Sequence, residues 1–197
     1  ERNDKLGIIN QYDPGALNDS VKMQRAVDTV GELINAEVLS GLNRGISVVL
    51  CVGETAVERG DGAFHEQKPR IEAALRSQLA IALKGVKEKL GDGTNLVIGY
   101  EPLWAIGPGK TPPGAEYIEF VVSFIETTVR DLYDFEPAVV YGGGLKEENA
   151  TAIGQIASLD GGLIALTRFA PPLAFEVAGL KKILERYTME NNGEPRS

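Results

Sequence analysis

The chain has 197 residues, of which 43% are hydrophobic, and its formal net charge at pH 7 is -8. This length and apolar content predict a single domain over residues 1–188 with a sizeable core, followed by a polar tail over residues 189–197. The acidic balance argues against nucleic acid and against an anionic membrane surface as partners.

A long helix is expected first, because Asn18-Asp19-Ser20 has the residue types of a helix cap. Its apolar face would consist of Met23, Val27, Val30 and Ile34. Four short apolar runs follow, and runs of this kind without alternation are typical of parallel strands buried on both faces. They extend over Ile46 to Val52, Leu96 to Tyr100, Ala138 to Tyr141 and Gly162 to Leu166.

Amphipathic helical patterns lie between and after these runs. Their apolar stripes are Ile71, Leu75, Leu79 and Ala82; Ile118, Val121, Val122, Ile125, Val129 and Leu132; Ala150 and Ile153; and Phe175, Leu180, Ile183 and Leu184. The alternation predicts an α/β fold, and two architectures fit it. One is a small open sheet with two unpaired edges, and the other is the later half of a closed barrel.

The segment from Gly99 to Thr111 is the most informative part of the chain. A predicted strand delivers Glu101 at its carboxyl end, where chemistry is concentrated in parallel α/β proteins. A loop with a large aromatic residue, two glycines and Lys110 comes next and could fold over that carboxylate. Glu101 is therefore predicted to be a general base, a role that suits a carboxylate whose pKa is raised by burial.

Three other motifs lie at the ends of the predicted strands. Cys51-Val52-Gly53-Glu54 closes the first predicted strand, Tyr141-Gly142-Gly143-Gly144 closes the third, and Leu159-Asp160-Gly161 opens the fourth. Together with the Glu101 segment they resemble the triosephosphate isomerase family from its fifth strand to its last helix. Glu1-Arg2 is similar to the family's motif just after the fourth strand. The resemblance implies a (β/α)8 TIM barrel, of which this chain carries the later half.

By this resemblance the protein is expected to interconvert glyceraldehyde 3-phosphate and dihydroxyacetone phosphate, or a related sugar phosphate, through an enediolate. Glu101 would be the base, and Trp104 to Lys110 would be the lid, with the backbone of Gly107 close to the substrate anion. Glu54 and Tyr141 match family positions that hold the lid in its open and closed states, and the alternative for either is a capping or core residue. No cofactor and no metal are implied, and a homodimer formed through an upstream loop is expected.

The family's lysine from the first strand and its histidine from the fourth would lie upstream of Glu1. Residues 1–197 alone are therefore expected to be inactive. A catalytically silent half-barrel that acts as a binding or assembly module is the alternative.

The phosphate end departs from the family pattern. Gly144 stands where members usually have serine, and Ala165-Leu166 stand where they have a glycine pair. A leucine there would crowd the anion, and the lost hydroxyl removes a donor worth about 1 kcal/mol. Arg168 could compensate, or it could be a surface arginine. An altered substrate, such as a four-carbon sugar phosphate, stays open.

Two remaining residues receive ordinary interpretations. Cys51, the single cysteine, suits a reducing compartment and is expected to pack near the site as a small hydrophobe. His65, the single histidine, is expected to be a solvated residue at a helix start. Because no apolar run approaches the roughly 20 residues that span a bilayer, cytoplasm is the default location.

Overall fold

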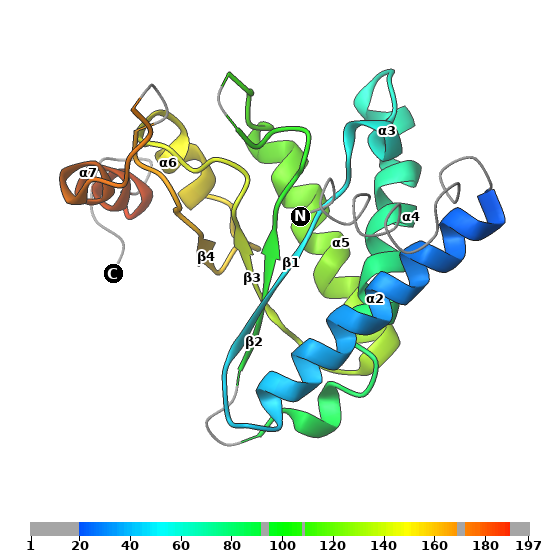
Figure 1. Ribbon diagram of the computed structural model, residues 1–197. Coiled ribbons are helices and arrows are strands. Elements are labelled where there is room, and N and C mark those ends of the chain that lie inside the picture. Colours follow the sequence, from blue (N-terminus) through cyan, green and yellow to red (C-terminus); the bar gives the residue numbers. More distant parts are fainter. Residues whose placement is uncertain (1–19, 92–94, 108, 169–171, 190–197) are drawn as a thin grey trace.

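The computed structural model describes residues 20–91, 95–107, 109–168 and 172–189 (Figure 1). The elements in chain order are α2 (Ser20–Leu42), β1 (Val48–Val52), α3 (Ala56–Arg59), α4 (Phe64–Ala82), η2 (Lys87–Lys89), β2 (Leu96–Tyr100), α5 (Ala115–Tyr133), β3 (Ala138–Tyr141), α6 (Glu147–Gly154), β4 (Gly161–Gly162) and α7 (Val177–Tyr187). The predicted alternation of strands and helices is confirmed. Glu1-Arg2 and the tail beyond residue 189 lie outside the described residues.

The strands of the described chain form one parallel sheet in the order β1-β2-β3-β4. Neighbouring strands are also neighbours in sequence, with Leu50 opposite Ile98 and Ile98 opposite Val139. The sheet is thus wound in one direction, with no reversal of strand order. That arrangement is part of a barrel rather than of a doubly wound sheet, in which the order reverses.

Burial alternates along the strands, which differs from the prediction of strands buried on both faces. Leu50, Ile98 and Val139 are buried, whereas Val49 is 51% exposed and Val97 is half-buried. The buried set belongs to one hydrophobic cluster that also contains residues of α2, α4, α5, α6 and α7. Helices therefore cover one face of the sheet. The other face is the one that a closed barrel would turn inward.

Two predicted strands have different bounds in the structure. The first begins at Val48, and Ile46 is 56% exposed. The fourth covers only Gly161–Gly162, so residues 163–166 continue as irregular backbone rather than as the predicted strand. Both runs are apolar, but each belongs to an outer strand, and an outer strand has a pairing partner on only one side.

The helices begin and end where local chemistry favours it. The Glu66 side chain accepts a hydrogen bond from the Ala63 amide at the start of α4, at 2.8 Å. The predicted stripe on α4 is buried, and so is the one on α5 except for its last member, since Leu75 and Ile125 are at 0% exposure but Leu132 is 41% exposed. On α7 only Ile183 of the predicted stripe is fully buried, and Phe175 precedes the helix and is half exposed.

In the long helix α2, the buried residues are not those of the predicted apolar stripe. Val27, Val30 and Ile34 are only half-buried, whereas Val38 and Leu42 near its end enter the core. None of the described helices is both long enough and apolar enough to cross a bilayer.

Candidate active site

Glu101 lies at the carboxyl ends of three neighbouring strands. Its amide donates a hydrogen bond to the Val52 carbonyl at the end of β1, at 2.8 Å. Its side chain passes over Gly142, where an added Cβ would lie 2.8 Å from Oε1 of Glu101. Only glycine leaves room for the carboxylate at that position. The predicted placement of Glu101 at a strand end is confirmed, and its role as a base stays a prediction.

Glu54 is a fully buried carboxylate directly beyond β1. Three side chains donate hydrogen bonds to it: Trp104 through Nε1 at 2.6 Å, Tyr117 at 2.7 Å and Tyr100 at 3.2 Å. Buried charges are stable in proteins only when they are hydrogen-bonded or paired, and this carboxylate accepts from three elements of the fold. Glu54 therefore ties the loop after β2 to β2 itself and to α5.

The tyrosines around Glu54 stay protonated. Burial, and then the negative charge of Glu54, raise the pKa of Tyr100 and of Tyr117 well above the ordinary phenol value. The same two causes raise the pKa of Tyr141. Because each phenol keeps its proton at any ordinary pH, Tyr100 and Tyr117 remain donors to the carboxylate.

The first half of the predicted lid is anchored. The Leu103 amide donates to the Glu54 carbonyl at 3.1 Å, and the Ala105 amide donates to the Pro102 carbonyl at 2.8 Å. The indole of Trp104 also meets the Tyr117 ring edge-on, with ring centroids 5.6 Å apart. Buried Ala105 completes this turn.

The second half of the lid projects into solvent. Ile106, Gly107, Gly109 and Lys110 are all exposed, and Gly107 has a φ of 116°. Figure 1 shows this loop rising beyond the carboxyl ends of the strands, between β2 and α5. The loop is thus held at one end and open at its tip. A hinged lid would have this distribution of contacts.

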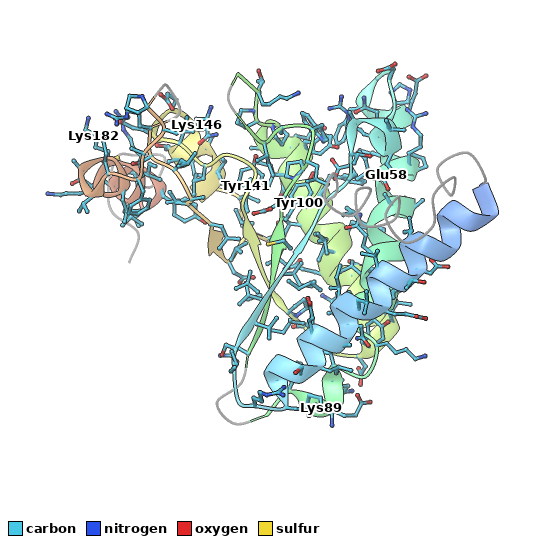
Figure 2. The ribbon with its side chains drawn as sticks, in the orientation of Figure 1. Glu58, Lys89, Tyr100, Tyr141, Lys146 and Lys182 are labelled. Carbon is cyan, nitrogen blue, oxygen red and sulfur yellow. The ribbon has the colours of Figure 1, made fainter. Side chains whose placement is uncertain are left out.

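Tyr141 lies next to Tyr100 in the sheet, and the two rings are 6.1 Å apart (Figure 2). Its buried hydroxyl donates to the Gly143 carbonyl at 2.8 Å and so braces the turn after β3. Gly144 follows with a φ of 99°, and an added Cβ would lie 3.3 Å from Pro112. We call Glu54, Glu101 and Trp104 with their contacts the base-and-lid end of the site.

The opposite side, which we call the anion end, consists of Gly144, Ala165, Leu166 and Arg168. Ala165 is exposed and Leu166 is half-buried. The Arg168 guanidinium forms an ion pair with Glu176 at 2.9 Å and donates to the Pro172 carbonyl at 2.8 Å. Arg168 thus has partners within its own segment, which precedes α7 at Val177.

The amides available to an anion are also reduced at this end. The Glu176 amide, at the N-cap of α7, donates to Thr167 Oγ1 at 2.6 Å. The Thr167 and Arg168 amides donate to the Ala174 carbonyl. An anion would need to displace these bonds or use other amides.

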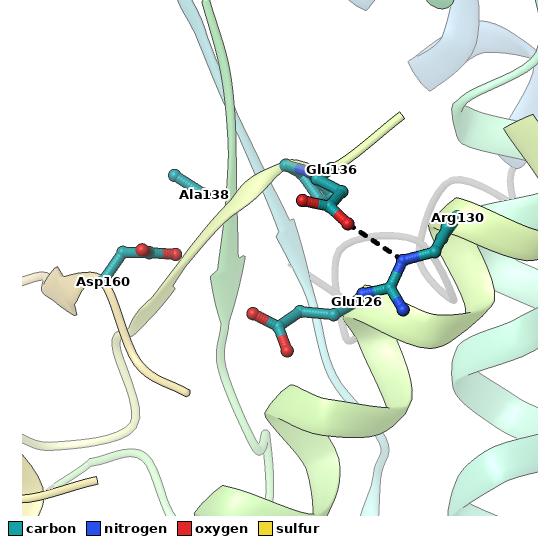
Figure 3. Close-up of a pocket in the computed structure, with 6 residues that line it drawn as sticks. Glu126, Arg130, Glu136, Ala138 and Asp160 are labelled. Atoms are coloured by element: carbon teal, nitrogen blue, oxygen red, sulfur yellow. Dashed lines mark ion pairs between the residues drawn. The ribbon is translucent and has the colours of Figure 1, made fainter. Parts of the chain in front are cut away.

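Two cavities among the described residues lie away from Glu101. One, of about 280 Å³, is at the amino ends of β3 and β4, and its lining includes Glu126, Arg130, Glu136 and Asp160 (Figure 3). The Arg130 Nε contacts Glu136 at 3.1 Å. The second, of about 220 Å³, runs along the outer edge of β1 beside α2.

The remaining predicted residues occupy ordinary positions. His65 is exposed in the first turn of α4, as predicted. Cys51 is half-buried in β1, with Sγ 3.1 Å from the position of a Cβ at Gly99. In the described part of the chain, no group of three or more His, Cys, Asp or Glu residues could hold a metal ion.

Sequence reasoning missed the partners that organise Glu54. By sequence, Tyr100 belongs to an apolar run and Tyr117 is not singled out, although a phenol in a packed element signals a hydrogen-bond partner. Gln78 was also missed, and its amide group bonds both the amide and the carbonyl of Gly53, at 3.1 and 3.0 Å. A polar side chain within the apolar stripe of α4 was the available signal.

Comparison with known proteins gives a consistent result. A protein-family model described as triosephosphate isomerase matches residues 24–172. The triosephosphate isomerase of Thermoanaerobacter sp. (strain X514) is 39% identical over 137 residues, which cover 68% of this chain and 51% of the relative. That of Chlorobium chlorochromatii is 40% identical over 136 residues, covering 66% of this chain and 49% of the relative. The chain spans about half the length of the curated relatives it matches.

Proposed function

The chain belongs to the triosephosphate isomerase family, and we propose that it carries the base and the lid of a sugar-phosphate isomerase. The proposed reaction interconverts glyceraldehyde 3-phosphate and dihydroxyacetone phosphate, or a closely related sugar phosphate, through an enediolate. The observation that carries the proposal is the position of Glu101 at the carboxyl ends of β1, β2 and β3, beside a loop anchored on buried Glu54. No cofactor or metal is part of this proposal.

In this mechanism Glu101 moves the proton between adjacent carbons of the substrate. A carboxylate can take a weakly acidic proton from carbon when the carboxylate is held close to that proton and is shielded from water. Closure of Trp104 to Lys110 would supply the shielding, and the amide of Gly107 would reach the substrate anion. Glu54 holds the start of the lid in the present arrangement, and Tyr141 is proposed to contact the lid when it closes.

An electrophile must polarise the substrate carbonyl. His65 is the single histidine of the chain and is exposed at the start of α4 rather than at a strand end. We propose that the electrophilic histidine and a lysine come from the half of the barrel that would pair with the outer edges of β1 and β4. The same half would supply the contacts of a homodimer, and the cytoplasm is the proposed location.

The residues of the anion end favour weak binding of the substrate phosphate. Leu166 carries a side chain where the family has glycine, and Arg168 is paired with Glu176. We therefore propose that glyceraldehyde 3-phosphate is handled less efficiently than by typical members. A four-carbon or otherwise altered sugar phosphate remains a proposed substrate for the same reason.

A second candidate function is a catalytically silent half-barrel that binds or assembles with another chain. The observation that favours it is the exposure of apolar side chains near both outer edges of the sheet. Ile46 before β1 and Val49 within it are 56% and 51% exposed, and Phe175 before α7 and Val177 at its start are 51% and 77% exposed. Such surfaces require a partner, whether or not the assembled barrel is active.

The test compares residues 1–197 alone with the same residues joined to, or mixed with, the strands that complete the sheet. The proposed isomerase function is supported if only the completed protein shows isomerase activity and a single cooperative melting transition. A completed protein that melts cooperatively but has no activity on any triose or tetrose phosphate supports the silent module. Activity from residues 1–197 alone contradicts the proposed source of the electrophile.

A further inference from the structure

Arg59 lies over the face of the lid tryptophan. It is the last residue of α3, and its guanidinium carbon is 4.0 Å from the centroid of the Trp104 ring. The same indole donates its N–H to Glu54 at 2.6 Å and meets Tyr117 edge-on. Trp104 is therefore held on three sides, by an anion at its N–H, a cation on its face and a ring at its side.

The contacts of Arg59 and Glu54 with the indole reinforce each other. A hydrogen bond from the indole N–H to a carboxylate pushes electron density into the ring, and an electron-rich ring attracts a cation more strongly. The charge of Arg59 in turn offsets that of the buried Glu54 across the ring. The positive charge of Arg59 acts against the rise in the pKa of Tyr117, so it is felt within the group of side chains around Glu54.

Hydrogen bonding does not explain why the Arg59 side chain is there. Its Nε is buried and has no hydrogen-bond partner. A guanidinium normally satisfies its donors with carboxylates, carbonyls or water, and leaving one unmet is costly. The stacking contact with Trp104 is the interaction that compensates for this arrangement.

The segment that carries both charges is built to be rigid. Thr55 and Glu58 form a capping box at the start of α3, with hydrogen bonds of 2.8 and 3.2 Å. Arg70 of α4 donates to the carbonyls of Arg59 and Asp61, at 2.8 and 2.6 Å. Glu54 and Arg59 thus lie at the two ends of one hydrogen-bonded turn, and they contact the N–H and the face of the indole.

We propose that Arg59 is a positioning residue, which holds the Trp104 indole against Glu54 and thereby sets the resting position of the lid. The consequence for catalysis rests on the proposed function, whereas the contact with Trp104 does not. Loss of the stack removes a contact made only while Trp104 stays at Glu54. The lid equilibrium is therefore expected to shift away from this position by about two- to five-fold.

The decisive variant is Arg59→Met, which keeps most of the side-chain length and removes the charge. Its matched control is Arg76→Met on α4, because Arg76 lies over Phe124 at 5.7 Å and makes the same kind of contact away from the lid. The probe is 5-fluorotryptophan in the completed protein and in residues 1–197. Trp104 is the single tryptophan of this chain, and Trp104→Phe assigns its fluorine signal.

Arg59→Met is expected to shift the Trp104 fluorine resonance and to increase its accessibility to a soluble paramagnetic quencher. Arg76→Met should leave the Trp104 resonance and its accessibility unchanged. Arg59→Lys should change both less than Arg59→Met does, because a cation is still present over the indole. An unchanged Trp104 signal in Arg59→Met overturns the proposal, and so does an equal change in Arg76→Met. If Arg59→Met does not fold, the comparison of Arg59→Gln with Arg76→Gln decides, because glutamine also lacks the charge: a Trp104 shift only in the first supports the proposal, and its absence overturns it.

Activity separates this inference from the proposed function. In an active completed protein, Arg59→Met should change kcat and KM together through the lid equilibrium, while Arg76→Met changes neither. A Trp104 shift in a completed protein that has no isomerase activity supports the positioning role and contradicts the proposed function. An altered kcat with an unchanged Trp104 signal overturns the positioning role alone.

Discussion

The base-and-lid end and the anion end of the site are built by different means. Glu54 accepts hydrogen bonds from β2, from the lid and from α5, and Gln78 of α4 brackets the neighbouring Gly53. At the anion end, the bonds of Arg168 to described residues lie within its own short segment, which follows a strand of two residues. A site residue is well positioned when separate elements of the core converge on it, and that condition holds at one end only.

The difference follows from where each end lies in the sheet. β1, β2 and β3 pair along four or five residues, and their carboxyl ends carry Glu54, Glu101 and Tyr141. β4 pairs with β3 at two positions and has no described partner on its other side. Because the anion end lies on an outer strand, it lacks the contacts that a further strand beside β4 would provide. The comparison therefore predicts large effects at the base-and-lid end and smaller ones elsewhere.

The largest effect is expected for Glu101→Gln in the completed, active protein. An amide cannot take the proton from carbon, so turnover should fall by about 10²–10⁴-fold while the melting temperature stays nearly unchanged. Steady-state kinetics and thermal melting measure the two quantities. Glu119→Gln, an exposed glutamate on α5, is the control and should retain full activity. Turnover within a few-fold of the parent would exclude Glu101 as the base.

Glu54 tests how strongly the base-and-lid end depends on its buried acceptor. Glu54→Leu leaves the donors of Tyr100, Trp104 and Tyr117 without their acceptor and should lower the free energy of unfolding by about 3 kcal/mol or more. Glu54→Gln keeps one oxygen for Trp104 and Tyr117 and should cost less. Urea unfolding of both variants is the measurement. If leucine costs no more than glutamine, the hydrogen bonds do not anchor the lid.

The anion end should respond weakly and in opposite directions. Leu166→Gly is expected to lower KM for glyceraldehyde 3-phosphate by a few-fold, because it removes a side chain that is expected to crowd the substrate anion. Gly144→Ser was expected from the sequence to act with it, but the φ of 99° at Gly144 makes a side chain there strained by roughly 1–3 kcal/mol. Gly144→Ser alone should therefore lower the melting temperature. An unmodified completed protein that already matches typical members on this substrate would show that the grip is intact.

The smallest effect concerns the cavity at the amino ends of β3 and β4. Burial, and next the charge of Asp160, raise the pKa of Glu126 above 4.5, while Arg130 acts in the opposite direction. A raised carboxyl pKa in the folded state means that stability is complete below the unfolded pKa and decreases as pH rises through the folded pKa. Glu126→Gln should therefore raise the melting temperature slightly at pH 7. The gain should vanish below about pH 4.5. A gain that is independent of pH would exclude this cause.

Much of the fold was predictable from local patterns. Strand β2, the stripes of α4 and α5 and the order of the elements follow from apolar periodicity, because a residue on the buried side must be apolar wherever an element packs on the core. The errors in strand bounds fall on the outer strands. Residues 163–166 and Ile46 are apolar as predicted but are not strand, since outer strands lack a neighbour that would extend their pairing.

The candidate site divides in the same way. The sequence alone determined that Glu101 follows a buried strand and that a glycine-bearing lid follows Glu101, because both are consequences of residue order along one segment. Tertiary structure alone decided that Glu54, Arg59 and Tyr117 converge on Trp104 and that Arg168 is paired with Glu176. Tyr117 is 63 residues from Glu54 in the chain. Contacts between segments so far apart depend on how helices pack over the sheet, and no local pattern of residues encodes that packing.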